Sequence, residues 1–201
     1  MAIGIKQATS LSSLELTLTS ILDGSCSADY IMGLVSLETS GKSSMEKVNR
    51  TIRRMTVNNK LLPFIQEHPQ DFLSDIHRGN NRGAIFTAIM CASYPVIYDF
   101  VTLCGRYFHA QDEVQSSLIF SKLSEKYGSN VDSIKGFNCT CRMLLEAGFI
   151  TRPRTGYYAI NRVSNLTDFA DSIYKKAFLL NNPNYSETDD VSSHPFFEFI
   201  K

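Results

Sequence analysis

The stretch EAGFITRPRTGYYAI, from Glu146 to Ile160, decides the fold of the C-terminal half of this chain. Two short apolar runs, Phe149 to Thr151 and Tyr157 to Ile160, flank a turn that holds two arginines, a proline and a glycine. Apolar runs around such a turn predict a β-hairpin. The tip of this hairpin is basic, although the chain of 201 residues carries 20 basic and 20 acidic side chains and no net charge.

Two helices should precede the hairpin. Apolar residues recur at helical spacing from Ser117 to Tyr127 and again from Val131 to Ala147. Gly128 is placed to end the first helix, Asn130 to cap the second and Gly148 to end it. Helix, turn, helix and β-hairpin is the order of a winged helix, whose second helix can enter the major groove of DNA while the hairpin reaches the neighbouring backbone.

Basic side chains are concentrated in this module. Between Lys135 and Arg162 there are five basic residues and one acidic residue, Glu146. This excess suits contacts with phosphates, and an asparagine on the open side of the second helix can read a base edge. Docking of a protein is the alternative use of such a module. The residues predicted to contact nucleic acid here are Lys135, Asn138, Arg142, Arg152 and Arg154.

Three further helices are expected near the N-terminus. Capping boxes at Ser12–Glu15 and Ser43–Glu46 predict the starts of the first and the third. Gly24 should end the first helix, a second should run from Ala28 to Leu37, and the third should continue to about Lys60. A short glycine-containing turn joins the second and third helices, which indicates a helix-turn-helix-like unit.

The third of these helices is basic on one side and apolar on the other. Val48, Ile52 and Met55 form an apolar stripe that predicts a buried face. The opposite face is either an ordinary solvated surface or a surface that contacts DNA phosphates. In the second case it holds one stretch of the DNA backbone while the hairpin arginines clamp another. The basic residues of this face are Lys47, Arg50, Arg53 and Arg54.

The rest of the chain completes a mainly α fold. A last helix is expected from Asn165 to Leu180, capped by Asn165, and an acidic, aromatic tail should pack on the core. We predict an N-terminal helical bundle with a helix-turn-helix-like unit in residues 1–110. A C-terminal winged helix with its short β-hairpin and the final helix should occupy residues 111–181, and the tail residues 182–201.

Several classes of function find no support in the residues. Five cysteines at irregular spacing favour reduced thiols in a cytoplasmic protein, and the isolated pair Cys139 and Cys141 lacks the further ligands of a structural zinc site. The apolar segment Gly83 to Val101 is interrupted by Pro95 and Asp99, so we expect no membrane span. No catalytic set or cofactor motif is recognisable, and we expect no enzymatic activity, cofactor, metal or small-molecule substrate.

Four segments resemble a known family: KVNRTIRRMTVNNKLL from Lys47, PFIQEHPQDFLSDI from Pro63, AIFTAIMCASYPVIYDFV from Ala84 and NCTCRMLLEAGFI from Asn138. In pattern and order they are similar to BrxA, the small protein of bacterial BREX phage-defence systems. The resemblance implies a cytoplasmic, mainly helical protein without known enzymatic activity that binds double-stranded DNA. It would act beside the methyltransferase, ATPase and phosphatase-like components of the system.

The chain departs from the BrxA pattern at one place. Family members typically carry a threonine or serine followed by two or three basic residues at the start of the last recognisable helix. The corresponding run, residues 137–142, has Arg142 as its one charged residue. This departure favours the basic N-terminal helix and the hairpin arginines as the stronger phosphate contacts.

The expected function is therefore that of a non-catalytic double-stranded DNA-binding component of a BREX-type system. Binding would depend mainly on phosphate-backbone contacts, and other BREX proteins are possible partners. Two alternatives remain open. One is a protein-interaction adaptor that uses its winged helix to dock larger defence components, and the other is a site-specific transcriptional regulator.

Overall fold

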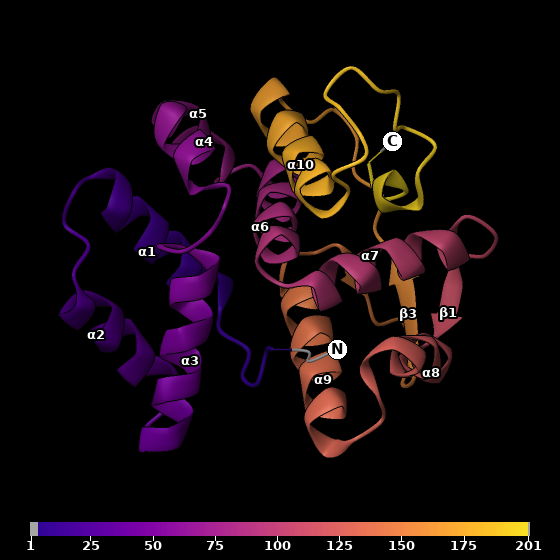
Figure 1. The fold of residues 1–201 in the computed structure, drawn as a ribbon, viewed down its shortest axis with the longest axis horizontal. Helices are drawn as coiled ribbons and strands as arrows, with labels where there is room; N and C mark the ends of the chain where they lie inside the picture. Colours follow the sequence, from indigo (N-terminus) through magenta and orange to yellow (C-terminus); the bar gives the residue numbers. More distant parts are fainter. Residues whose placement is uncertain (1–3, 201) are drawn as a thin grey trace.

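A computed structural model describes residues 4–200 of the protein. In this range the chain forms ten α-helices, a short 3₁₀ helix and a three-stranded antiparallel sheet, so the mainly α prediction is confirmed (Figure 1). The first three helices pack against one another at one side of the molecule. They are α1 (Leu11–Leu22), α2 (Ala28–Glu38) and α3 (Lys42–Met55).

The boundaries of α1 and α3 differ from the prediction. Ser10, not Ser12, caps α1, because the Ser10 hydroxyl is held by Glu38 (2.9 Å) and accepts from the Ser13 amide (3.1 Å). Gly41 precedes α3 without a side-chain cap. Helix α3 also ends at Met55, short of the expected Lys60. Just beyond that end, the side-chain amide of Asn59 donates to the Met55 carbonyl (3.2 Å).

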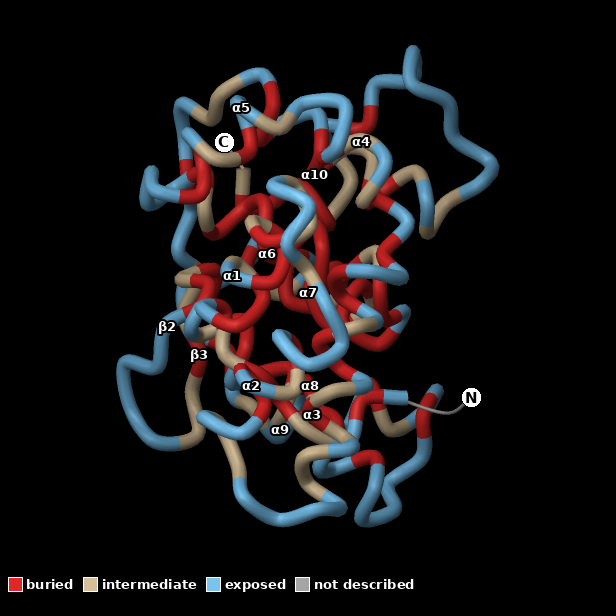
Figure 2. Tube along the Cα trace, turned by 90° about the vertical axis from the view of Figure 1, so that its left-hand side faces the viewer, coloured by how far each residue is buried: buried red, intermediate tan, exposed pale blue. Residues whose placement is uncertain are grey.

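Helix α6 (Gly79–Ser93) is the centre of the core. Eleven of its 15 residues are buried, including polar Thr87, which is the pattern of a helix enclosed on all sides. Figure 2 shows the same segment as a buried stretch in the middle of the molecule. Three of the four helices in this part have a proline in their first turn. Proline is tolerated there because the backbone N–H that it lacks would have no carbonyl partner within the helix. The remaining helices here are α4 (Leu62–Glu67), α5 (Pro69–Asp75) and α7 (Pro95–Phe108).

The predicted helix–turn–helix–hairpin order is present after α7. Asn130 caps the second helix by accepting from the Ser133 amide (2.9 Å), and the two hairpin strands pair antiparallel. An additional strand, which we did not predict, pairs with the second hairpin strand and places Val114 opposite Tyr158. The elements are β1 (Glu113–Gln115), α8 (Ser116–Tyr127), α9 (Val131–Glu146), β2 (Ile150–Thr151) and β3 (Tyr157–Ile160).

The last helix and the tail cover the other end of the core. Helix α10 (Asp168–Asn181) packs along α6, and Thr167 caps it instead of the predicted Asn165, which adopts a positive φ of 57°. The 3₁₀ helix η1 (Pro195–Phe197) packs on α7. Phe196, Phe197 and Phe199 are buried, so the predicted packing of the tail is confirmed.

Two further points complete the fold. In the part of the chain that the structure describes, every helix is too short or too polar to cross a bilayer. The division into residues 1–110, 111–181 and 182–201 stays a prediction, and its outermost residues, 1–3 and 201, lie outside the described part.

Candidate nucleic-acid interface

The solvent face of α9 carries a row of polar and basic side chains. Lys135, Asn138 and Arg142 are spaced by three and four residues, so they share one face of the helix, and all three are exposed. Val131, 66% exposed, begins the same row one turn earlier. Within residues 4–200, none of the three polar side chains is in a salt bridge or a side-chain hydrogen bond. The row is therefore available to a ligand.

The hairpin tip places two arginines beside this helix, one paired with an acid and one that contacts the Tyr158 side chain. Arg154 donates to Glu113 of β1 (Nε to Oε2, 3.0 Å), and its guanidinium lies 3.8 Å above the ring of Tyr157. Arg152 is exposed, without an acidic partner among the described residues, and 5.7 Å from the ring of Tyr158. Gly156, at φ 81°, permits the turn that brings both arginines to the tip.

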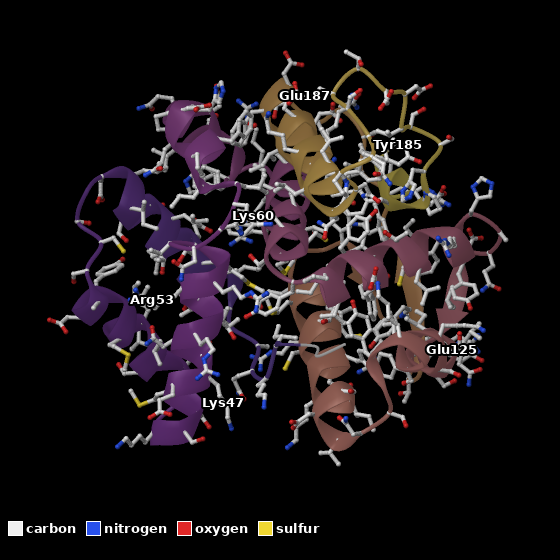
Figure 3. The ribbon with its side chains drawn as sticks, in the orientation of Figure 1. Lys47, Arg53, Lys60, Glu125, Tyr185 and Glu187 are labelled. Carbon is white, nitrogen blue, oxygen red and sulfur yellow. The ribbon has the colours of Figure 1, made fainter. Side chains whose placement is uncertain are left out.

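Helix α3 presents the second basic surface, on which one arginine is also engaged internally. The Nε of Arg54 donates to the Ser93 carbonyl (2.9 Å), and its guanidinium lies 4.3 Å above the Tyr94 ring. Lys47, Arg50 and Arg53 form no salt bridge with a described residue. Figure 3 labels Lys47 and Arg53 on α3.

The N-terminal segment connects the two basic helices. The Thr51 hydroxyl of α3 donates to the Gln7 carbonyl (3.0 Å), and the Leu11 amide donates to Glu146 at the end of α9 (2.8 Å). The Ala8 amide lies against the half-buried Cys139 thiol of α9, whose pKa is raised by burial. This segment runs between α3 and α9, which lie toward the same end of the molecule in both views (Figures 1 and 2).

Besides Arg154, one more of the five basic residues of this stretch is engaged within the fold. Arg162 donates to the buried Glu198 (2.8 Å) and to the Phe108 carbonyl (3.0 Å), and thereby ties the tail to α7. Glu146, the acid of this stretch, is occupied by the Leu11 amide. The basic residues of this stretch that pair with no described acid are Lys135, Arg142 and Arg152.

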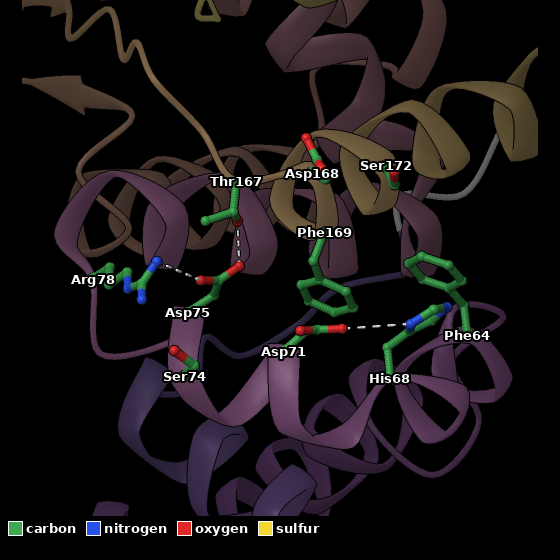
Figure 4. Close-up of a pocket in the computed structure, with 10 residues that line it drawn as sticks. All are labelled: Phe64, His68, Asp71, Ser74, Asp75, Arg78, Thr167, Asp168, Phe169 and Ser172. Carbon is green, nitrogen blue, oxygen red and sulfur yellow. Dashed lines mark hydrogen bonds and ion pairs between the residues drawn. The ribbon is translucent and has the colours of Figure 1, made fainter.

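A cavity of about 640 Å³ lies between α5 and the start of α10 (Figure 4). Its buried carboxylate, Asp75, accepts from the Thr167 hydroxyl and from the side-chain amide of Asn81 (3.0 Å), and it faces Arg78 at 3.6 Å. His68 pairs with Asp71 at the rim (3.6 Å). The buried acid thus fixes the start of α10 against α5, and its oxygens are engaged by protein groups.

Within residues 4–200, no three His, Cys, Asp or Glu side chains are grouped as a metal site would require.

Comparison with known proteins found no family, no curated protein and no solved structure that matches the chain. The resemblance to BrxA therefore stays a prediction from the sequence segments alone.

Three lysines near α10 were missed in the sequence. Lys60, Lys175 and Lys176 come together around one groove, although Lys60 lies more than a hundred residues from the other two. The Lys175–Lys176 pair was a weak local signal. Its connection to Lys60 follows from the packing of distant segments.

Proposed function

We propose that this protein binds double-stranded DNA without catalysing a reaction, mainly through contacts with the phosphate backbone. The observation that carries the proposal is the exposed row Lys135, Asn138 and Arg142 on α9, the second helix of the predicted pair. A cationic row without acidic partners attracts phosphates and releases their counterions. An exposed asparagine among these cations can contact a base edge.

We further propose that β1, α8, α9, β2 and β3 act as a winged helix. The support is the order of the elements, the turn of residues 128–130 between α8 and α9, and the sheet order β1-β3-β2. In this role α9 enters the major groove, and the hairpin tip with Arg152 contacts the adjacent backbone. Arg154 contributes less, since Glu113 already neutralises it.

The basic face of α3 supplies the second contact in this proposal. Lys47, Arg50 and Arg53 would hold another stretch of backbone, while Arg54 stays with Ser93 and Tyr94. The shared N-terminal segment keeps α3 and α9 at a fixed separation. The resulting interface has two clamps, and its binding should depend strongly on salt and weakly on sequence.

The biological setting in the proposal is a BREX-type phage-defence system, with other BREX proteins as partners. This part rests on the resemblance of four sequence segments to BrxA. A test is recovery of the protein together with the methyltransferase or ATPase of a BREX system, from cells that express all of them at native levels. Absence of any such association would contradict the BREX assignment and leave the DNA-binding proposal standing.

Fluorescence-anisotropy titration of a random duplex across a salt series tests DNA binding. We expect tight binding at low salt, and a log–log salt slope that becomes shallower by about one for each phosphate contact removed by Lys135→Ala or Arg142→Ala. Lys60→Ala is the matched control, because it removes an exposed cation without a salt bridge to a described residue, beside α4 and α10 and away from α9.

Three outcomes of this titration have distinct meanings. Absence of binding at low salt would contradict the proposal and favour the adaptor alternative. Preference for one duplex over random sequence by ~10³ or more would indicate a site-specific regulator. An unchanged slope for both α9 variants would move the interface away from this helix.

A further inference from the structure

An apolar groove with a cationic rim lies between α4 and α10. A cavity of about 370 Å³ has Pro63, Phe64, Leu179 and Leu180 among its lining residues. A second cavity of about 210 Å³ continues it along α10, and both are lined by Phe64, Leu179, Lys176 and Glu187. Leu180 is 39% exposed, so part of the apolar surface of the groove is in contact with water.

The rim of this groove is basic. Lys60 lies on one side, exposed and without a salt bridge to any described residue. Lys175 and Lys176 line the continuation along α10. The one acid that lines either cavity is Glu187, although Asp189 and Asp190 also interact with the charge of Lys175. Lys60 is therefore the cation of the groove that no described acid engages.

Glu187 shows how the groove holds an acid. Its carboxylate accepts from the Lys176 ammonium (2.9 Å), which lowers the pKa of Glu187, and its backbone carbonyl accepts from Lys175 (2.8 Å). The same Lys176 ammonium lies 4.9 Å from the centroid of the Phe64 ring. A carboxylate, an ammonium and an apolar wall are therefore already combined at this place by the chain itself.

We propose that this groove docks a short segment of a partner protein that combines acidic and large apolar residues. The apolar side chains would cover Phe64, Leu179 and Leu180, and a carboxylate would pair with Lys60. Charge complementarity selects this occupant over a basic or neutral segment. The partner would add its own acidic groups to the carboxylate that Glu187 already places in this groove.

The groove lies away from the proposed DNA interface. Helices α4 and α10 are at one end of the molecule and α9 is at the other in both views, and Figure 3 labels Lys60 and Glu187 on the groove side (Figures 1, 2 and 3). The protein could then hold DNA and a partner at the same time. The docking proposal does not depend on DNA binding.

A phage-displayed library of random peptides, selected on the full chain, tests the groove. We expect the recovered peptides to combine Asp or Glu with Leu, Phe or Met. A synthetic peptide of the recovered sequence should bind Lys60→Glu about ten-fold more weakly than the wild type, and Leu180→Gln should also weaken it. Lys42→Glu is the charge-matched control, at the start of α3 and outside the groove, and should bind like the wild type.

The result that overturns the proposal is also defined. Recovery of no acidic and apolar sequence class, or equal binding of the peptide by wild type and Lys60→Glu, would contradict it. Circular dichroism checks that each variant is folded. We expect both variants to fold, because the side chains of Lys60 and Leu180 are exposed. If Lys60→Glu weakens binding of a random duplex as much as Arg142→Ala does, the groove belongs to a nucleic-acid surface and the partner proposal is wrong.

Discussion

Arg54 and Arg154 are exposed arginines whose charges are already engaged. Arg54 binds the Ser93 carbonyl and lies over Tyr94, and Arg154 binds Glu113 and lies over Tyr157. The sequence led us to predict that both contact nucleic acid. Residue type and spacing do not show which side chains and carbonyls lie next to an arginine in the folded protein. At the residue scale, the availability of a cation is set by its neighbours in space.

Glu113→Gln should release Arg154 and strengthen DNA binding. The substitution removes the carboxylate 3.0 Å from the guanidinium and leaves the contact with Tyr157. The salt slope should steepen by at most about one, the value of one added phosphate contact. Stability should change little, because exposed ion pairs contribute ~0–1 kcal/mol.

The measurement is anisotropy titration over a salt series, with Glu67→Gln as control. Glu67 is an exposed acid at the end of α4, so its loss changes the net charge equally at a distant place. Equal effects of the two substitutions would show that net charge alone changes affinity. No effect of Glu113→Gln would place the hairpin tip outside the interface.

His194 should make the stability of the tail dependent on pH. Its Nδ1 accepts from the Phe196 amide (3.1 Å), and its ring packs on Phe178. Burial, and then the charge of Arg106, lower the pKa of His194 below its ordinary value of 6.5. A lowered pKa in the folded state gives stability that is present above the unfolded value and is lost as pH falls through the folded value.

Thermal unfolding followed as a function of pH tests this point. The unfolding midpoint of the wild type should fall as the pH drops below 6.5. His194→Asn keeps an acceptor for the Phe196 amide but does not titrate, so its midpoint should depend less on pH. The same pH dependence in both proteins would assign the effect to other groups.

At the scale of elements, strong local signals predicted positions well and weak ones did not. Gly128 and Asn130 fixed the turn between α8 and α9 to within a residue. The starts of α1 and α10 were wrong by a few residues, since tertiary contacts of Ser10 and Thr167 select the cap over an equally suitable neighbour. Strand β1 was missed because its three residues have no period of their own and are ordered by pairing with β3.

The close approach of the tail to α7 gives a sharp prediction for Gly105. A Cβ at this position would lie 1.8 Å from the Pro195 carbonyl oxygen, so α7 or the tail must move to admit it. Gly105→Ala should lower the free energy of unfolding by about 2 kcal/mol or more, as expected for overpacking. Chemical denaturation measures this change.

Gly33→Ala is the control for that experiment. Gly33 lies inside α2, and nothing stands within 4 Å of an added Cβ. The substitution should raise the free energy of unfolding by roughly 0.5–1 kcal/mol, because alanine favours the helix over glycine. A stabilising effect at both positions would contradict the observed docking of the tail on α7.

At the scale of the whole molecule, the arrangement depends on contacts between distant segments. The N-terminal segment joins α3 to α9 through Thr51, Cys139 and Glu146. We did not predict this connection from the sequence. The presence of helices and the hairpin follows from local patterns. The common end shared by the two basic helices, and the groove of Lys60 with Lys176 at the other end, follow from packing around α6.

We propose above all that the exposed face of α9 contacts DNA. The most direct measurement is the change of backbone amide NMR shifts when a short random duplex is titrated into the labelled protein. We predict the largest shifts in α9 around Lys135, Asn138 and Arg142 and at the hairpin tip near Arg152, with smaller ones along α3. Saturable binding that leaves the α9 and hairpin amides unchanged, while other amides shift, would contradict the claim.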